Sequence, residues 1–140
     1  MKRVFFAKIE LLHPLLGWLH DCLAPMDFDS NVLRQIELAC EEAFVNIIQH
    51  AYQGLPEEIE IEVTLFPKSR VEITFKDHGP PFNPLAAKEV DPLSALEEKD
   101  VGGLGIHLIR KLMDEVRYNR IQGLNVLILI KKFSRSSQRK

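Results

Sequence analysis

The sequence predicts an α+β fold in which a largely antiparallel sheet carries its helices on one face. Apolar and polar residues alternate in two runs, 59–66 and 70–76, which is typical of strands with one buried face. Apolar residues recur at helical spacing between residues 30 and 52. A second pair of strand-like runs, 115–121 and 125–132, follows another helix-like segment. The expected order is therefore strand, helix, helix, strand, strand, loop, helix, strand, strand.

The composition is that of one globular domain. The chain has 140 residues, of which 46% are hydrophobic and 27% charged, and its net charge is −2. We expect a single domain over residues 1–133 and a basic tail over 134–140, which is either solvated or docks on an acidic partner. The charge gives no general case for nucleic-acid binding, and no apolar run is long enough to cross a membrane. Cys22 and Cys40 lie outside any CxxC pair, so a cytoplasmic location is expected.

The N-terminal half predicts one strand and two helices. The strand is expected at residues 4–10, and a helix follows over 13–23 with Pro14 in its first turn, where its missing N–H does no harm. Asp29 and Ser30 are candidate caps for the longest helix, which extends to about Tyr52. Its buried stripe is predicted to contain Ile36, Cys40, Ala43, Phe44, Ile47, Ile48 and Ala51.

The C-terminal half predicts two hairpins with a loop and a helix between them. PKS joins the runs 59–66 and 70–76 into an antiparallel hairpin. DHGPPFNP then ends the strand pattern, and the charged residues 85–101 form at most one short helix. A glycine-rich stretch opens a helix that ends near Asp114, and QGL joins the last two strands.

Two polar residues of the long helix share one face. Glu42 and Asn46 are four residues apart, and they lie roughly 130° around the helix from the centre of the apolar stripe. An amide oxygen can coordinate a hard cation such as Mg²⁺, while a carboxylate one turn earlier can accept a proton. On spacing alone, a solvated helix face is the simpler explanation of the pair.

Asp77 and the glycines offer two further candidate sites. Asp77 directly follows a strand, in a turn stiffened by two prolines, where it is either the acceptor of an Asx-type turn or a buried acceptor for an exocyclic amine. The sequence GGLG contains Gly102, Gly103 and Gly105 at a helix start, where free backbone N–H groups favour an anion such as phosphate. Neither the Walker nor the GxGxxG pattern is present.

These features, in this order, resemble the GHKL (Bergerat-fold) ATP-binding superfamily, which includes histidine kinases and gyrase B. Within it the chain is most similar to the small bacterial anti-sigma-factor serine/threonine kinases. EEAFVNIIQHAY resembles the N box, DHGPPFNP the first glycine box, GGLGIHLIRKLMDEV the second, and QGLNVLIL the last box. The resemblance implies a Bergerat-type two-layer α/β sandwich, with a mixed, mostly antiparallel sheet and helices on one face.

The resemblance also implies roles for single residues. Asn46 would hold the Mg²⁺ that bridges the ATP phosphates, and Glu42 would be the general base. Asp77 would accept a hydrogen bond from the adenine amino group, with Gly79 beneath the base and Asn125 near it.

Further ATP-binding positions follow from the two glycine boxes and the segment between them. The glycines would support a lid hinge and phosphate-facing amides, while Leu104 and Ile106 line the pocket or belong to the core. Lys99 would contact the γ-phosphate, because Val101 stands where some relatives carry an arginine. The ATP-binding positions in these segments are Phe82, Lys99, Gly102, Gly103, Leu104, Gly105 and Ile106.

The function implied is an ATP- and Mg²⁺-dependent protein serine/threonine kinase that acts as an anti-sigma factor or a related switch in transcription. Its substrate would be a Ser or Thr of a STAS-type anti-anti-sigma protein, and its other partners a sigma factor and a second copy of the chain. The alternative is a nucleotide-dependent module that sequesters a regulator without significant phosphoryl transfer. An ATPase subdomain of a larger machine is a third interpretation.

Overall fold

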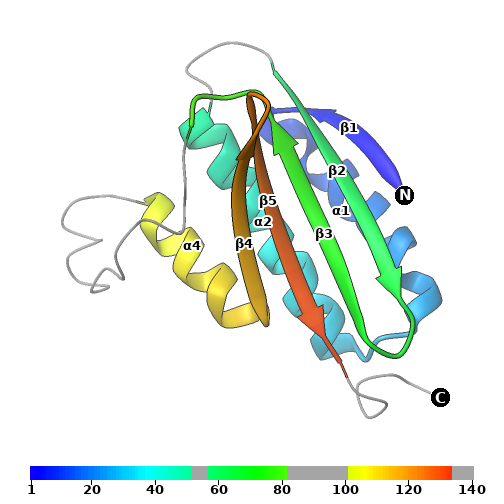
Figure 1. Ribbon diagram of the computed structural model, residues 1–140. Coiled ribbons are helices and arrows are strands. Elements are labelled where there is room, and N and C mark those ends of the chain that lie inside the picture. The colour runs from blue at the N-terminus through cyan, green and yellow to red at the C-terminus, as the bar shows by residue number, and fades with distance from the viewer. Residues whose placement is uncertain (52–56, 82–100, 134–140) are drawn as a thin grey trace.

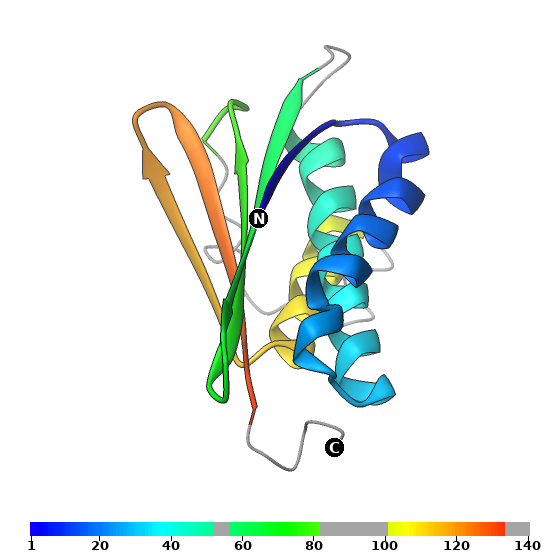
Figure 2. The same ribbon diagram turned by 90° about the vertical axis from the view of Figure 1, so that its right-hand side faces the viewer.

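The computed structural model describes residues 1–51, 57–81 and 101–133, which form two layers. One layer is a five-stranded sheet, and the helices cover one of its faces (Figures 1 and 2). The strands are β1 (Lys2–Phe6), β2 (Glu58–Phe66), β3 (Arg70–Asp77), β4 (Glu115–Ile121) and β5 (Leu124–Lys132). They lie in the order β1-β2-β3-β5-β4, and the described neighbours all pair antiparallel. The predicted α+β class is confirmed.

The helical layer contains three α-helices among the described residues, α1 (Leu12–Leu23), α2 (Ser30–Ala51) and α4 (Val101–Leu112), with short 3₁₀ helices η1 (Ile9–Leu11) and η2 (Ala24–Met26). Asp29 caps α2, because its Oδ1 accepts from the Val32 N–H at 2.9 Å. At the C-terminus of α4, Lys131 Nζ donates to the Leu112 carbonyl, where a cation is favoured.

The core lies between the two layers. Alternation along β2 and β3 turns one set of apolar side chains toward the helices, and each of these is at most 1% exposed: Ile59, Ile61, Val63, Val71, Ile73 and Phe75. The opposite side of the sheet, which we call the outer face, carries the intervening residues, which include Glu58, Glu60 and Glu62.

The cysteines belong to this core. Cys22 and Cys40 are both buried and unbridged, so the free thiol predicted for Cys40 is confirmed. Burial raises the pKa of both thiols, which keeps them protonated and unreactive.

The structure corrects the predicted first strand, 4–10. The strand is Lys2–Phe6, and Ile9–Leu11 is a 3₁₀ helix. Pairing with β2 ends after the Ala7 N–H donates to the Glu57 carbonyl at 2.7 Å. The chain must then leave the sheet so that α1 can cover it, and this tertiary constraint is absent from the local pattern.

The last hairpin has a two-residue turn at Gln122 and Gly123. Their φ angles are 50° and 80°, and Ile121 pairs with Leu124 across the turn. Two consecutive left-handed residues are typical of the type I′ turn, whose twist matches that of the flanking strands. This turn fixes the register of β4 on β5.

The same substitution is predicted to have opposite effects at Gly17 and Gly123, which lie outside both glycine boxes. Gly17 lies inside α1 with open space around its Cβ position, so Gly17→Ala should raise the free energy of unfolding by about 0.5–1 kcal/mol. Gly123 also has open space but a φ of 80°, so Gly123→Ala should lower it by about 1–2 kcal/mol. Urea unfolding measures both, and effects of the same sign would contradict the turn geometry.

Candidate functional site

Two polar side chains meet where the central strands end. Asp77 is the last residue of β3 and pairs with Asn125 of β5 on one side and Ile59 of β2 on the other. The Asn125 Nδ2 donates to Asp77 Oδ1 at 3.1 Å, and both side chains are buried, with exposures of 6% and 3%. Both belong to the helix-facing set of the sheet, so the pair lies at the edge of the core.

The turn after β3 is held by several hydrogen bonds. Asp77 Oδ1 accepts from the Gly79 N–H at 2.9 Å, which is the Asx-type bond expected from the sequence. Asn125 Nδ2 also donates to the Pro80 carbonyl at 2.9 Å, and its Oδ1 accepts from the Tyr118 hydroxyl. Arg120 donates to the Gly79 carbonyl at 2.7 Å. The backbone at residues 79 and 80 is therefore fixed against the sheet.

Glu57 adds a second carboxylate beside this pair. It lies two residues before Ile59 and so on the helix-facing side, and its Oε2 is buried without a hydrogen-bond partner in the described structure. Burial raises the pKa of the Glu57 carboxyl, the charge of Asp77 raises it further, and His78 partly offsets the rise.

Helix α2 carries the other predicted pair. Asn46 is only 5% exposed and Glu42 is half-buried, so Asn46 does not lie on a solvated face. Helix α2 packs against α4 in addition to the rest of the core, which explains burial beyond a single apolar stripe (Figure 2). The pKa of Glu42 is raised, mainly by burial and secondly by the negative charge of Glu41.

The glycine box opens α4, as the sequence predicted. Helix α4 starts at Val101, so Gly102 and Gly103 lie in its first turn, where backbone N–H groups have no partner within the helix. Gly105 and the candidates Leu104 and Ile106 follow in the same helix. Phe82 and Lys99 lie outside the described residues, as does the basic tail 134–140.

These segments converge on one part of the molecule. The end of β3, the C-terminal half of α2 and the start of α4 all lie toward the same end of the domain (Figure 1). An acceptor carboxylate, a buried amide and a helix N-terminus are thus gathered there from three distant parts of the chain.

Sequence reasoning missed Tyr118, Arg120 and Glu57. A signal for the first two existed, because a two-residue turn at Gln122 and Gly123 makes Arg120 the direct partner of Asn125. The same register brings Tyr118 within reach on the same face. Glu57 could have been found from strand alternation, because it lies two residues before Ile59 and therefore on the same side of the sheet.

Two kinds of feature are absent from the described residues. No group of three or more His, Cys, Asp or Glu side chains gathers there in a way that could hold a metal ion. None of the helices described is long and apolar enough to cross a membrane.

Known proteins resemble this chain in sequence. The serine-protein kinase RsbW of Bacillus mycoides (strain KBAB4) is 35% identical over 107 residues, which cover 74% of this chain and 66% of that protein. The serine-protein kinase RsbW of Listeria monocytogenes serotype 4a (strain HCC23) is 29% identical over 106 residues, which cover 72% and 67%. The matched region thus spans about two thirds of the length of these relatives.

Solved structures share the fold. The RsbU and RsbW domains of a Mycobacterium tuberculosis protein align over all of this chain and 34% of that chain, with a TM-score of 0.67 and 17% identity. The histidine kinase domain of a blue-light-activated kinase from Erythrobacter litoralis aligns over 86% of this chain and 60% of that one, with a TM-score of 0.55 and 14% identity. The model of the histidine kinase-like ATPase domain matches residues 5–131. The chain therefore belongs to the histidine kinase-like ATPase domain family.

Proposed function

We propose that this chain is an ATP-binding protein kinase that phosphorylates a serine or threonine of a regulatory partner. The observation that carries the proposal is that Glu42 lies one helical turn before the buried Asn46, in the half of α2 that lies toward the same end of the domain as the end of β3. The family is an ATPase family, and the relatives named above are serine-protein kinases. A module that only bound nucleotide would have no need of a half-buried carboxylate at position 42.

The adenine end of the site is assigned to β3 and β5. A buried carboxylate that faces the core is a strong acceptor for an exocyclic amine, and Asp77 meets this description. Asn125 orients Asp77 through the 3.1 Å hydrogen bond, and Gly79 lets a flat base approach the backbone. Asn125 is a positioning residue in this scheme, because its amide is engaged by Asp77 and Pro80.

The phosphate end is assigned to α2 and α4. The amide oxygen of Asn46 suits Mg²⁺, which takes oxygen ligands and usually keeps only one or two from the protein when it is bound through phosphates. The absence of an acidic or histidine cluster among the described residues fits such an ion, because the nucleotide would supply most of its ligands. The first turn of α4 offers backbone N–H groups to the same phosphates.

Glu42 is proposed to accept the proton of the attacking hydroxyl. Bound ATP with its Mg²⁺ would supply the phosphoryl group and neutralise its charge. A carboxylate whose pKa is raised is a stronger proton acceptor than an ordinary glutamate. We also propose that the partners are a STAS-type anti-anti-sigma protein, a sigma factor and a second copy of the chain, and that the protein is cytoplasmic.

Replacing the proposed base separates transfer from binding. Glu42→Gln should lower phosphoryl transfer by roughly 10²–10⁴-fold while ATP affinity changes little, because the amide cannot take the proton. Transfer of ³²P from ATP to a STAS-type protein measures the rate. Glu41→Gln is the matched control, since it removes the neighbouring half-buried carboxylate and should retain transfer. Wild-type rates in Glu42→Gln would refute the base, and partner binding without any label in the wild type would indicate the sequestering module instead.

A nucleotide comparison tests Asp77. The wild type should bind ATP about 10–100-fold more tightly than purine riboside triphosphate, which lacks the 6-amino group, because a hydrogen bond to a charged acceptor contributes about 1.5–3 kcal/mol. In Asp77→Asn this ratio should fall to a few-fold. If losing the contacts with Gly79 and Asn125 damages the site, the affinity for both nucleotides falls by the same factor, and this effect cancels in the ratio. A ratio that Asp77→Asn leaves unchanged would exclude Asp77 as the adenine acceptor.

Glu57 predicts a pH dependence of stability in the nucleotide-free protein. Its pKa is raised in the folded state, so ionised Glu57 opposes folding, and the stability present at low pH is lost as pH rises through the folded pKa. Glu57→Gln does not titrate, so its stability relative to the wild type should increase between about pH 4 and pH 7. Urea unfolding at both values measures this. Glu58→Gln, whose carboxylate is exposed to water, should show a much smaller change; equal changes would contradict the burial of Glu57.

A further inference from the structure

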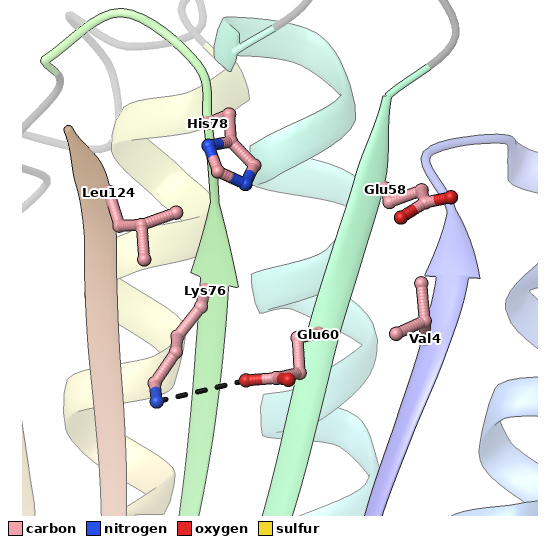
Figure 3. A pocket seen from close by; sticks show the side chains of 6 residues that line it. All are labelled: Val4, Glu58, Glu60, Lys76, His78 and Leu124. Atoms are coloured by element: carbon pink, nitrogen blue, oxygen red, sulfur yellow. Dashed lines mark ion pairs between the residues drawn. The ribbon is translucent and has the colours of Figure 1, made fainter.

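The outer face of the sheet contains a pocket on the side away from the helices (Figure 3). Its volume is about 180 Å³. The lining comes from four neighbouring strands and the residue after β3, and consists of Val4, Glu58, Glu60, Lys76, His78 and Leu124. None of these residues belongs to the proposed nucleotide site, because strand alternation directs them to the opposite face.

The size of this pocket limits its occupant. Sites for nucleotides and other drug-sized ligands usually enclose about 300–1,000 Å³. A volume near 180 Å³ is too small for such a ligand but can accept one long side chain. A single side chain of a larger molecule that lies across the outer face would fit this volume.

The residues that line the pocket indicate which type of side chain it would accept. Lys76 and Glu60 form an ion pair at 3.7 Å, so their charges offset each other. The exposed side chain of Glu58 has no ion pair or hydrogen bond among the described residues, so one carboxylate in the lining is not engaged by a cation there. Val4 on β1 and Leu124 on β5 lie on opposite sides of the pocket in Figure 3, so that each border of the pocket is apolar. A cationic head on an aliphatic stem matches both features.

The surroundings extend the match beyond one side chain. Val4 is 50% exposed, and Phe6, two residues along the same edge strand and on the same face, is 48% exposed. Glu62 continues the acidic row of Glu58 and Glu60 along β2. An apolar border beside an acidic row favours a segment that carries apolar residues next to its cation.

We propose that this pocket is a docking site for a partner protein, which inserts an arginine or lysine side chain flanked by apolar residues. The cation pairs with Glu58, its methylene stem packs against Val4, and the flanking residues cover Phe6 on one side and Leu124 on the other. The docking site lies on the face opposite the nucleotide residues, so this proposal does not depend on whether the chain transfers phosphate.

Titration with a short peptide tests the site. The probe is acetyl-Val-Arg-Val-amide, added to ¹⁵N-labelled protein while backbone amide shifts are recorded, and the matched peptide replaces arginine with neutral citrulline. We expect saturable shifts centred on Glu58, Lys76, His78 and Leu124, with a Kd on the order of 1 mM, as suits a single exposed side chain. The citrulline peptide should bind at least about threefold more weakly, in keeping with a partly exposed ion pair.

Two variants distinguish binding in the pocket from general electrostatic attraction to the acidic outer face. Glu58→Gln should weaken binding of the arginine peptide about three- to fivefold. Glu62→Gln removes the same charge from the same strand and face, outside the pocket lining, and should change the Kd by less than about 1.5-fold.

Four results would overturn the proposal. They are no saturable shift at the pocket residues up to about 20 times the expected Kd, equal binding of the citrulline peptide, equal effects of the two variants, and shifts that follow protein concentration without peptide. The last result would assign the outer face to a second copy of this chain.

Discussion

The pairing of β3 with β5 is the constraint on which the rest of the molecule depends. β3 lies at the centre of the sheet, and its last residue, Asp77, is matched with Asn125 by eight successive residue pairs. A shift of one residue would turn Asp77 and Phe75 to the outer face together. The register that closes the core is thus the same register that presents a carboxylate to the candidate nucleotide site.

Much of the fold could be predicted from local patterns, because each strand and helix has one apolar face. The runs 59–66 and 70–76 alternate so regularly that their boundaries differ from the structure by one residue at most. The first strand was predicted too long, since the turn into η1 is imposed by the need to place α1 over the sheet. The burial of Asn46 was not evident from the helix pattern either, and α2 packs against α4, a helix that is distant in sequence.

The candidate site, like the fold, could be predicted from the sequence only in part. Asp77, Asn125, Glu42 and Asn46 stand out in the sequence because polar residues interrupt apolar patterns there, and the structure adds which of them touch. The contact of Asp77 with Asn125 follows from strand register rather than from either motif. Their roles toward ATP and Mg²⁺ are proposals that rest on the resemblance and on this geometry.

The end of β3 has a consequence for communication through the sheet. Lys76 and His78 line the outer pocket, while Asp77 between them faces the core, so three consecutive residues contribute to two opposite surfaces. Only the single sheet separates the outer pocket from the candidate nucleotide site at this point. If a molecule bound in the outer pocket changes the affinity of the opposite face for its ligand, that ligand must change the affinity of the pocket by the same factor, because binding free energies form a closed cycle.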